Sequence, residues 1–147
     1  MIQIAVFLDS GFLLGLCHPK DKYAKVSEEI LKTLSTSDQG LLYISDFIIS
    51  EVTTLVAVRS GNDIKVLEHL GKLVWGNERI VTVLQSSSEI VLNSWKLFKK
   101  VNAIDLKGKG TMSFVDITSV ILCKNHQIDS IVSFDPHFDR FLIRIYK

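Results

Sequence analysis

Short apolar segments alternate with longer helical segments along nearly the whole chain, and this alternation constrains the fold more than any other feature. The apolar segments are rich in valine, isoleucine and leucine, which is typical of buried strands. The predicted strands span residues 2–8, 41–45, 79–84, 130–134 and 141–146. The predicted helices span residues 10–17, 21–34, 46–59, 62–75, 89–101 and 113–126. This order predicts an α/β fold of three layers, α/β/α, with a central and mostly parallel sheet.

The length and composition predict one folded domain over residues 1–147. A chain of 147 residues is the size of an ordinary domain, and we find no internal repeat, low-complexity tract or linker in it. With 47% hydrophobic and 22% charged residues, the composition excludes a disordered chain. The formal net charge is only +1, so contact with a nucleic acid would have to come from a local basic patch.

The amino-terminal segment and the cysteines indicate the cellular compartment in which the protein is expected. Asp9 interrupts the apolar amino-terminal segment, which also lacks a basic leader, so we do not expect a signal peptide. No stretch approaches the roughly 18 uncharged apolar residues of a membrane span. Cys17 and Cys123 are too few and too scattered for a disulfide framework and are predicted to be core thiols. We therefore expect a soluble, cytoplasmic protein.

Four carboxylates interrupt apolar sequence at places where the fold would otherwise favour leucine. Asp9 directly follows the first predicted strand and Asp135 follows the fourth, so both belong at the carboxyl edge of the sheet, where ligands bind in such folds. Glu51 shares a helix face with apolar residues, and Asp116 lies in the first turn of an apolar helix. An unpaired buried carboxylate costs several kcal/mol, and several together repel one another. A hard divalent cation such as Mg²⁺ or Mn²⁺, which prefers oxygen ligands, would neutralise them.

Each carboxylate considered alone has a structural alternative. Asp9 could cap the helix that follows it, and Asp116 could complete a capping box with Ser113. Asp139 and His137 are most simply explained as solvated turn residues. Glu51 is the hardest to explain in this way, because its own helix offers no basic partner. The joint pattern, rather than any single residue, favours a metal site.

Three segments resemble the successive motifs of the PIN domain, a family of metal-dependent ribonucleases that includes the VapC toxins. They are "VFLDSGFLLGL", "ISEVTTLV" and "SFVDITSVILCKNHQIDSIVSFDPHFDRF", in the order that the family has them. The resemblance implies an acidic cluster of Asp9, Glu51, Asp116 and Asp135, supporting hydroxyls on Ser10 and Ser133, and Asp139 as an optional outer ligand. Gly11 is a departure, since VapC-type sequences commonly carry asparagine or serine there.

The resemblance implies a ribonuclease that uses Mg²⁺ or Mn²⁺ to hydrolyse RNA phosphodiester bonds, with a possible role as the toxin of a toxin–antitoxin pair and an antitoxin as its partner. A PIN nuclease of RNA processing and a metal-dependent phosphatase are the alternatives. A phosphatase with Asp9 as nucleophile would want a second aspartate two residues on, where this chain has Gly11. A PIN-like module that only binds partners would be expected to lack one of the acidic positions, and none is missing.

Basic residues near the carboxyl-terminal motif are the candidates for RNA binding. Lys107 and Lys109 lie on the predicted loop 105–110, and Arg140 follows Asp139. Lys99, Lys100 and Arg144 could extend such a rim. Trp75 and Trp95 are predicted to be core or interface residues rather than surfaces on which bases stack.

Two consecutive apolar helices predict a homodimer. Helices that are apolar nearly all round need partners on more than one face. We therefore expect a two-fold dimer through residues 46–59 and 62–75. Some of the apolar residues of this pair should remain uncovered in a lone protomer, and the alternative is that all of them fill the core. The residues are Val56, Leu67, Leu70, Leu73, Val74 and Trp75.

Overall fold

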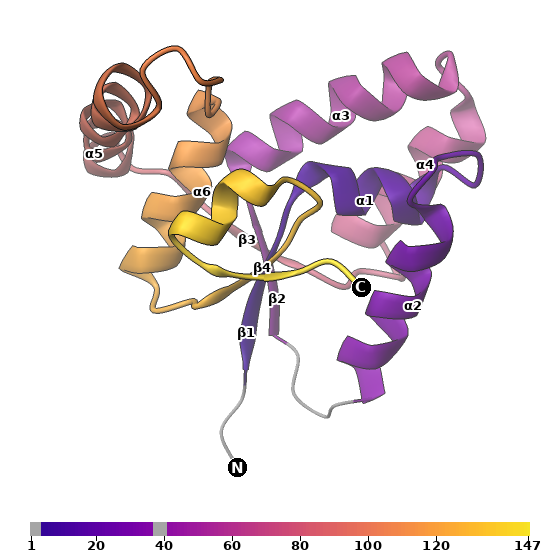
Figure 1. The fold of residues 1–147 in the computed structure, drawn as a ribbon. Coiled ribbons are helices and arrows are strands. Elements are labelled where there is room, and N and C mark those ends of the chain that lie inside the picture. Colours follow the sequence, from indigo (N-terminus) through magenta and orange to yellow (C-terminus); the bar gives the residue numbers. More distant parts are fainter. Residues whose placement is uncertain (1–3, 37–40) are drawn as a thin grey trace.

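The computed structural model describes residues 4–36 and 41–147. Five short strands run through the centre of the molecule, with α1, α2 and α4 on one side of them and α5 and α6 on the other (Figure 1). The strands are β1 (Ala5–Leu8), β2 (Leu41–Ser45), β3 (Thr82–Leu84), β4 (Ser130–Val132) and β5 (Ile143–Ile145). The α-helices are α1 (Ser10–Cys17), α2 (Ala24–Thr36), α3 (Asp46–Ser60), α4 (Ile64–Val74), α5 (Ser88–Lys99) and α6 (Phe114–Asn125). A π-helical segment, η1 (Lys100–Leu106), and a 3₁₀-helix, η2 (Pro136–Arg140), complete the described elements. The three-layer α/β/α prediction is confirmed.

The order of the strands places the carboxyl ends of β1 and β4 at the centre of the molecule. The sheet order is β3-β2-β1-β4-β5, and all four neighbouring pairs are parallel. From β1 the chain adds β2 and β3 on one side, then returns to add β4 and β5 on the other. Such a reversal opens a crevice beyond the strand ends, where ligands bind in parallel sheets. Leu8 pairs with Val132, so Asp9 and Ser133, the residues that follow, are neighbours at this crevice.

The sequence of β1 and α1 explains why both are buried. Phe7 and Leu8 on β1 and Phe12 and Leu13 on α1 are fully buried, as expected for segments without a polar face. Both cysteines are buried free thiols, as predicted. Asp9, which lies between β1 and α1, is therefore held in place by two buried elements.

Several element ends differ from the predictions. Ser35 and Thr36, predicted as turn, are the last residues of α2, and the rest of that turn, 37–40, lies outside the described residues, as do residues 2 and 3 of the first predicted strand. The helix predicted over 89–101 continues through η1 to Leu106, so the loop carrying the two candidate lysines begins at Lys107. Local sequence does not fix such ends, because a helix can continue for as long as packing supports it.

The surface predicted for a dimer is smaller than the sequence indicated. Val56, Leu70, Leu73 and Val74 are core residues, exposed by 7% or less. Among the predicted residues, Trp75 is 62% exposed. These four residues fill the core, because α3 and α4 pack against each other and against α1, and only some of the six predicted residues stay uncovered.

No helix within residues 4–36 and 41–147 has the length and apolar character needed to cross a membrane.

Candidate functional site

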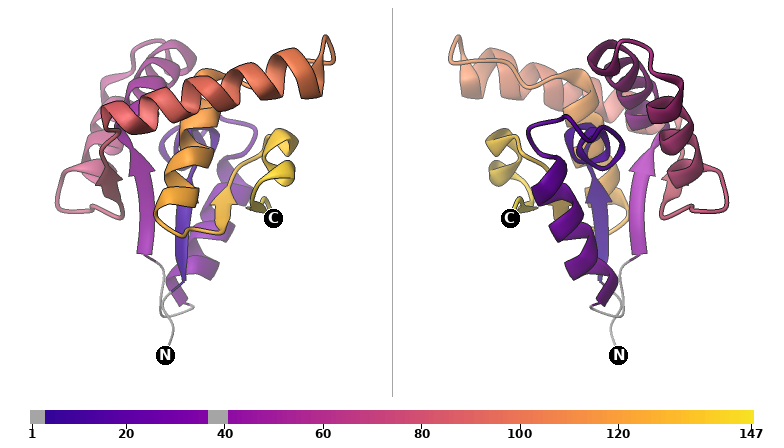
Figure 2. Two further views of the ribbon diagram at one scale, coloured as in Figure 1. Left: turned by 90° about the vertical axis from the view of Figure 1, so that its left-hand side faces the viewer. Right: turned by 90° about the vertical axis from the view of Figure 1, so that its right-hand side faces the viewer.

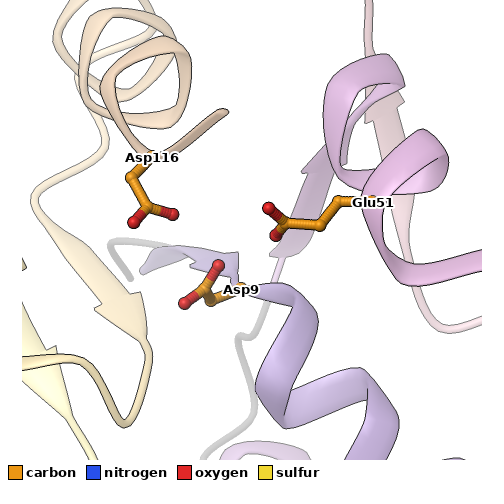
Figure 3. Close-up of side chains that lie close together, drawn as sticks. All are labelled: Asp9, Glu51 and Asp116. Atoms are coloured by element: carbon orange, nitrogen blue, oxygen red, sulfur yellow. The ribbon is translucent and has the colours of Figure 1, made fainter. Parts of the chain in front are cut away.

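Three carboxylates from distant parts of the chain meet at the crevice beyond β1. Asp9, Glu51 and Asp116 each offer one carboxylate oxygen, and these oxygens lie within 4.8 Å of one another. Figure 3 shows the three side chains pointing toward a common space from the end of β1, from α3 and from α6. We refer to Asp9, Glu51 and Asp116 as the carboxylate trio.

Asp9 is fixed by hydrogen bonds to both of its carboxylate oxygens. As the residue before α1, it accepts a hydrogen bond of 2.9 Å from the backbone N–H of Ser10. The Ser133 hydroxyl donates to the other oxygen at 2.6 Å. Asp9 is only 8% exposed, so these bonds replace most of its contact with water. Asp9 therefore caps α1 and also faces the carboxylates of Glu51 and Asp116. The sequence had left helix capping and metal binding open as alternatives, and the geometry is compatible with both.

Glu51 reaches the site from the second turn of α3. This helix begins with Ser45 as its cap, whose hydroxyl accepts a hydrogen bond of 3.1 Å from the backbone N–H of Ile48. The Ser10 hydroxyl donates a hydrogen bond to Oε1 of Glu51. Ser10 thus binds Asp9 through its backbone N–H and Glu51 through its hydroxyl, and so fixes the positions of the two carboxylates relative to each other.

Asp116 reaches the site from the first turn of α6. Its backbone N–H donates to the Ser113 hydroxyl at 3.1 Å, which caps the helix. In a complete capping box the Asp116 carboxylate would bond back to the Ser113 N–H. Among the described hydrogen bonds there is none of that kind, and the Asp116 carboxylate faces those of Asp9 and Glu51 instead.

Burial and the charges of neighbouring carboxylates oppose the ionised forms of Asp9 and Asp116. Burial, together with the charges of Asp9, Glu51 and Asp135, raises the pKa of Asp116 to about 8. Burial also raises the pKa of Asp9 to about 6, although the hydrogen bond from Ser133 acts in the opposite direction. No lysine or arginine of the described chain forms an ion pair with the trio. A site of this kind favours a proton or a cation.

The other two predicted carboxylates are placed differently. Asp135 lies at the border of the site, outside the trio: its Oδ1 accepts a hydrogen bond of 2.9 Å from the backbone N–H of His137, and its side chain is 41% exposed. Its charge still raises the pKa of Asp116. Asp139 binds the Arg144 guanidinium through both oxygens, at 2.9 and 3.2 Å, and this pairing lowers its pKa. The expectation that four carboxylates converge therefore holds for three of them in the described structure.

Ser133 connects the trio to Asp135. Its hydroxyl donates to Asp9 and accepts a hydrogen bond of 3.1 Å from the backbone N–H of Asp135. Ser133 is fully buried, so neither bond has water as a ready substitute. The supporting position that the resemblance implied for this hydroxyl corresponds to two specific hydrogen bonds.

Of the residues predicted to bind RNA, two lysines are exposed, whereas Arg140 is paired with a carboxylate. Lys107 and Lys109 are exposed on the loop after η1. Arg140 lies 3.4 Å from the Asp105 carboxylate, which also binds Lys100 at 3.2 Å. These pairings reduce the charge that Arg140 offers to a phosphate.

An apolar cavity adjoins the trio at Glu51. Its volume is about 440 Å³. The lining residues are Phe47, Ser50, Glu51, Thr54, Leu55, Val58 and Val115. A carboxylate at the edge of an apolar cavity gives the site space for a substrate group beside the charged centre.

An aromatic chain that the sequence did not reveal lies beside this cavity, and of the two roles predicted for the tryptophans, core or interface, the core role is excluded. Trp95 and Trp75 are 49% and 62% exposed rather than core. Trp95 stacks on Phe98 of the same helix, and Phe98 contacts Phe114 of α6. The available signal was the spacing of Trp95, Phe98 and Lys99, which places all three on adjacent positions of one helix surface.

The Gly11 departure from the VapC pattern is not imposed by packing. A Cβ atom built at Gly11 would meet Phe134 at 3.8 Å, an ordinary contact distance.

Neither a family model nor a curated protein sequence matches the chain, but solved structures do. VapC20 of Mycobacterium tuberculosis, described as a Sarcin-Ricin loop cleaving toxin, superposes with a TM-score of 0.71 at 19% identity, over 92% of this chain and 93% of that one. VapBC2 from Rickettsia felis, solved with a DNA fragment from their promoter, gives 0.66 at 12% identity over 97% and 98%. FitAcB from Neisseria gonorrhoeae gives 0.63 at 15% identity over 96% of each chain. Likeness at such identities establishes the fold, which is the PIN-domain fold that the sequence motifs implied.

Proposed function

Starting from the PIN-domain fold, we propose that this chain is an endoribonuclease that hydrolyses RNA phosphodiester bonds with Mg²⁺ or Mn²⁺. The observation that carries the proposal is the convergence of the Asp9, Glu51 and Asp116 carboxylates without a basic partner among the described residues. Such a cluster is costly for a fold to keep unless it serves a purpose.

The donor atoms of the trio fit a hard divalent cation. All are carboxylate oxygens, which Mg²⁺ and Mn²⁺ prefer over nitrogen or sulfur. In the proposed site Asp9 and Asp116 would hold the ion, with Asp135 at the border of the site. Asp139 is a poorer candidate, because Arg144 already occupies its carboxylate. When bound, the ion supplies charge neutralisation and lowers the pKa of a water molecule.

The chain's own residues then orient the substrate and move a proton. Ser133 and Ser10 hold Asp9 and Glu51 in fixed positions, so little reorganisation is needed when a phosphodiester enters. Glu51, which lies at the edge of the cavity, or Asp135, which is partly exposed, accepts the proton of the attacking water. Because the pKa of Asp116 is raised to about 8 without the ion, binding of the ion releases a proton near neutral pH.

We extend the proposal to a toxin that is held inactive by an antitoxin. The support is that one structural neighbour is described as a toxin and another was solved with a promoter fragment. A nuclease of RNA processing and a metal-dependent phosphatase remain the alternatives. Expression of the chain in a bacterial host tests the extension: the wild-type chain alone should arrest growth, and the Asp116→Asn variant should not.

A homodimer also remains part of the proposal, now with a surface around exposed Val58, Ile64 and Trp75. Light scattering at micromolar concentration tests it. A mass twice the 16.6 kDa of the chain is expected, and a mass that stays at 16.6 kDa contradicts it.

Cleavage of a labelled single-stranded RNA tests the enzymatic proposal. Wild-type protein should cleave the RNA with Mg²⁺ or Mn²⁺ and not with a chelator, whereas Asp116→Asn should be inactive in both. Asp139→Asn is the matched control, because it removes a carboxylate outside the trio. Cleavage that persists in the chelator, or in Asp116→Asn, overturns the assignment. Hydrolysis of a phosphomonoester without cleavage of RNA would favour the phosphatase.

A further inference from the structure

A long helical rod lies next to the carboxylate trio. Helix α5 runs without a break into η1, and Figure 2 shows the two as one rod lying across the amino-terminal end of α6. That end of α6 carries Asp116. The surface of the rod is therefore adjacent to the proposed site of cleavage.

Four aromatic rings connect this rod to the cavity beside Glu51. The centroids of Trp95 and Phe98 are 6.0 Å apart, those of Phe98 and Phe114 are 5.9 Å apart, and those of Phe114 and Phe47 are 5.9 Å apart. Phe47 lines the same cavity as Glu51. The chain of rings thus begins at a half-exposed tryptophan and ends at the wall of the candidate active site.

Lysines outnumber carboxylates along the rod and the loop that follows it, although Lys100 is paired with Asp105. Residues 88–109 contain five exposed lysines against two carboxylates, Glu89 and Asp105. The lysines are Lys96, Lys99, Lys100, Lys107 and Lys109. The ammonium of Lys99 lies 5.5 Å from the Trp95 ring centroid. A phosphate attached to a base stacked on Trp95 would be within reach of this flexible side chain.

The combination of rings and lysines distinguishes the possible occupants. Protein interfaces are depleted in lysine, whereas surfaces that bind single-stranded nucleic acids combine exposed aromatic rings with positive charge. The net charge of +1 for the whole chain makes the local excess of lysine here more distinctive.

We propose that single-stranded RNA enters the site across α5, with one base stacked on Trp95 and its phosphate bound by Lys99. The proposal rests on RNA being the substrate of the carboxylate trio, and it names the surface that positions this substrate. Trp95 and Lys99 are positioning residues, since they lie on the rod and not among the carboxylates.

Fluorescence of a protein with one tryptophan tests the stacking directly. In the Trp75→Phe background Trp95 is the sole tryptophan, because the chain has two. Titration with a single-stranded RNA oligonucleotide in a chelator, where the proposed cleavage does not occur, should quench its emission. In the otherwise wild-type protein, Trp95→Ala should weaken binding roughly fivefold or more, and Trp95→Phe should retain most of it. Lys99→Ala should make the negative slope of log affinity against log salt concentration less steep by about 0.7.

Matched variants separate this surface from general effects. Trp75→Ala removes the more exposed of the two tryptophans, and Lys65→Ala removes an exposed lysine of α4; both should bind RNA as the wild type does. Unquenched Trp95 emission on saturation with RNA, or equal losses in the Trp95 and Trp75 variants, overturns the inference. Quenching by a protein partner but not by RNA also overturns it. If RNA is cleaved but Trp95 is not quenched, only the inference fails; if Trp95 is quenched but RNA is never cleaved, only the proposed enzyme fails.

Discussion

The hydroxyl of Ser133 donates a hydrogen bond of 2.6 Å to the carboxylate of Asp9, although 124 residues separate the two in the chain. The contact follows from the topology: β1 and β4 are adjacent and parallel, so the residues that follow them are neighbours. The bond favours the ionised form of Asp9, the form able to bind a cation, and opposes the effect of burial.

Replacing Ser133 with alanine should weaken metal binding by roughly 10- to 100-fold, the usual cost of losing a group that orients a metal ligand. Without the hydroxyl the pKa of Asp9 rises further, so binding requires a higher pH. The Asp135 N–H also loses its partner, which should lower the free energy of unfolding by about 1–3 kcal/mol. Titration calorimetry with Mn²⁺ at two pH values measures the first effect, and thermal melting measures the second.

Ser94→Ala is the control for that variant. Ser94 is equally buried, and its hydroxyl donates to the Ile90 carbonyl within α5, outside the trio. It should change stability without changing the affinity for Mn²⁺. Equal losses of affinity in both variants would mean that Ser133 acts only through the fold.

The stability of the metal-free protein should fall as the pH rises from about 4 to about 8. The unfolded chain ionises its aspartates near pH 3.8, but in the folded state the pKa of Asp9 is raised to about 6 and that of Asp116 to about 8. The folded state therefore binds these protons more tightly, and the resulting stability is fully present below pH 3.8 and is lost through each raised pKa. The loss is at most about 9 kcal/mol, since the two shifts together amount to about 6 pKa units and one unit corresponds to about 1.4 kcal/mol. Melting in a chelator across this range checks the direction, and Mn²⁺ should restore stability at pH 8.

Asp116→Asn should make the metal-free protein more stable at pH 8, by roughly 1–3 kcal/mol, because it removes one charge from a repelling cluster. The same change should abolish the stabilisation that Mn²⁺ gives to the wild type. Paired melts with and without Mn²⁺ measure both effects. A destabilised variant that still responds to Mn²⁺ would remove Asp116 from the site.

Asp135→Asn should reduce cleavage by less than Asp116→Asn does, because Asp135 lies at the border of the trio and is partly exposed. Asp139→Asn should leave cleavage nearly unchanged and should cost at most about 1 kcal/mol of stability, since its pair with Arg144 is exposed. Initial rates and melting temperatures of the two variants distinguish these roles. If Asp139→Asn proves as inactive as Asp116→Asn, the division drawn here between the trio and its surroundings is wrong.

The sequence was sufficient for the layers, the strand positions and three converging carboxylates, because each depends on local pattern. Asp9 follows a strand whose apolar residues predict that the strand is buried. Glu51 interrupts an apolar helix. The positions of Asp135 and Asp139 were not predictable in this way. Their carboxylates are turned aside by a backbone N–H at His137 and by Arg144, and these partners depend on the 3₁₀ turn of η2.

The exposure of Trp95 was also beyond local sequence. An amphipathic helix shows which residues share a face, but not how far a neighbouring element covers that face. Packing of the neighbouring element decides this: Phe98 is partly buried and contacts Phe114 of α6, whereas Trp95 on the same helix stays 49% exposed. Tertiary packing, rather than propensity, thus determined which tryptophans are available to a ligand.

Anomalous diffraction from crystals equilibrated with Mn²⁺ at neutral pH tests the central claim most directly. The claim is that Asp9, Glu51 and Asp116 form a site for a divalent cation. We predict an anomalous peak in the space bounded by the three carboxylates in the wild type, and no peak there in Asp116→Asn. A wild-type crystal without a peak between these carboxylates, or with Mn²⁺ bound only elsewhere, would contradict the account.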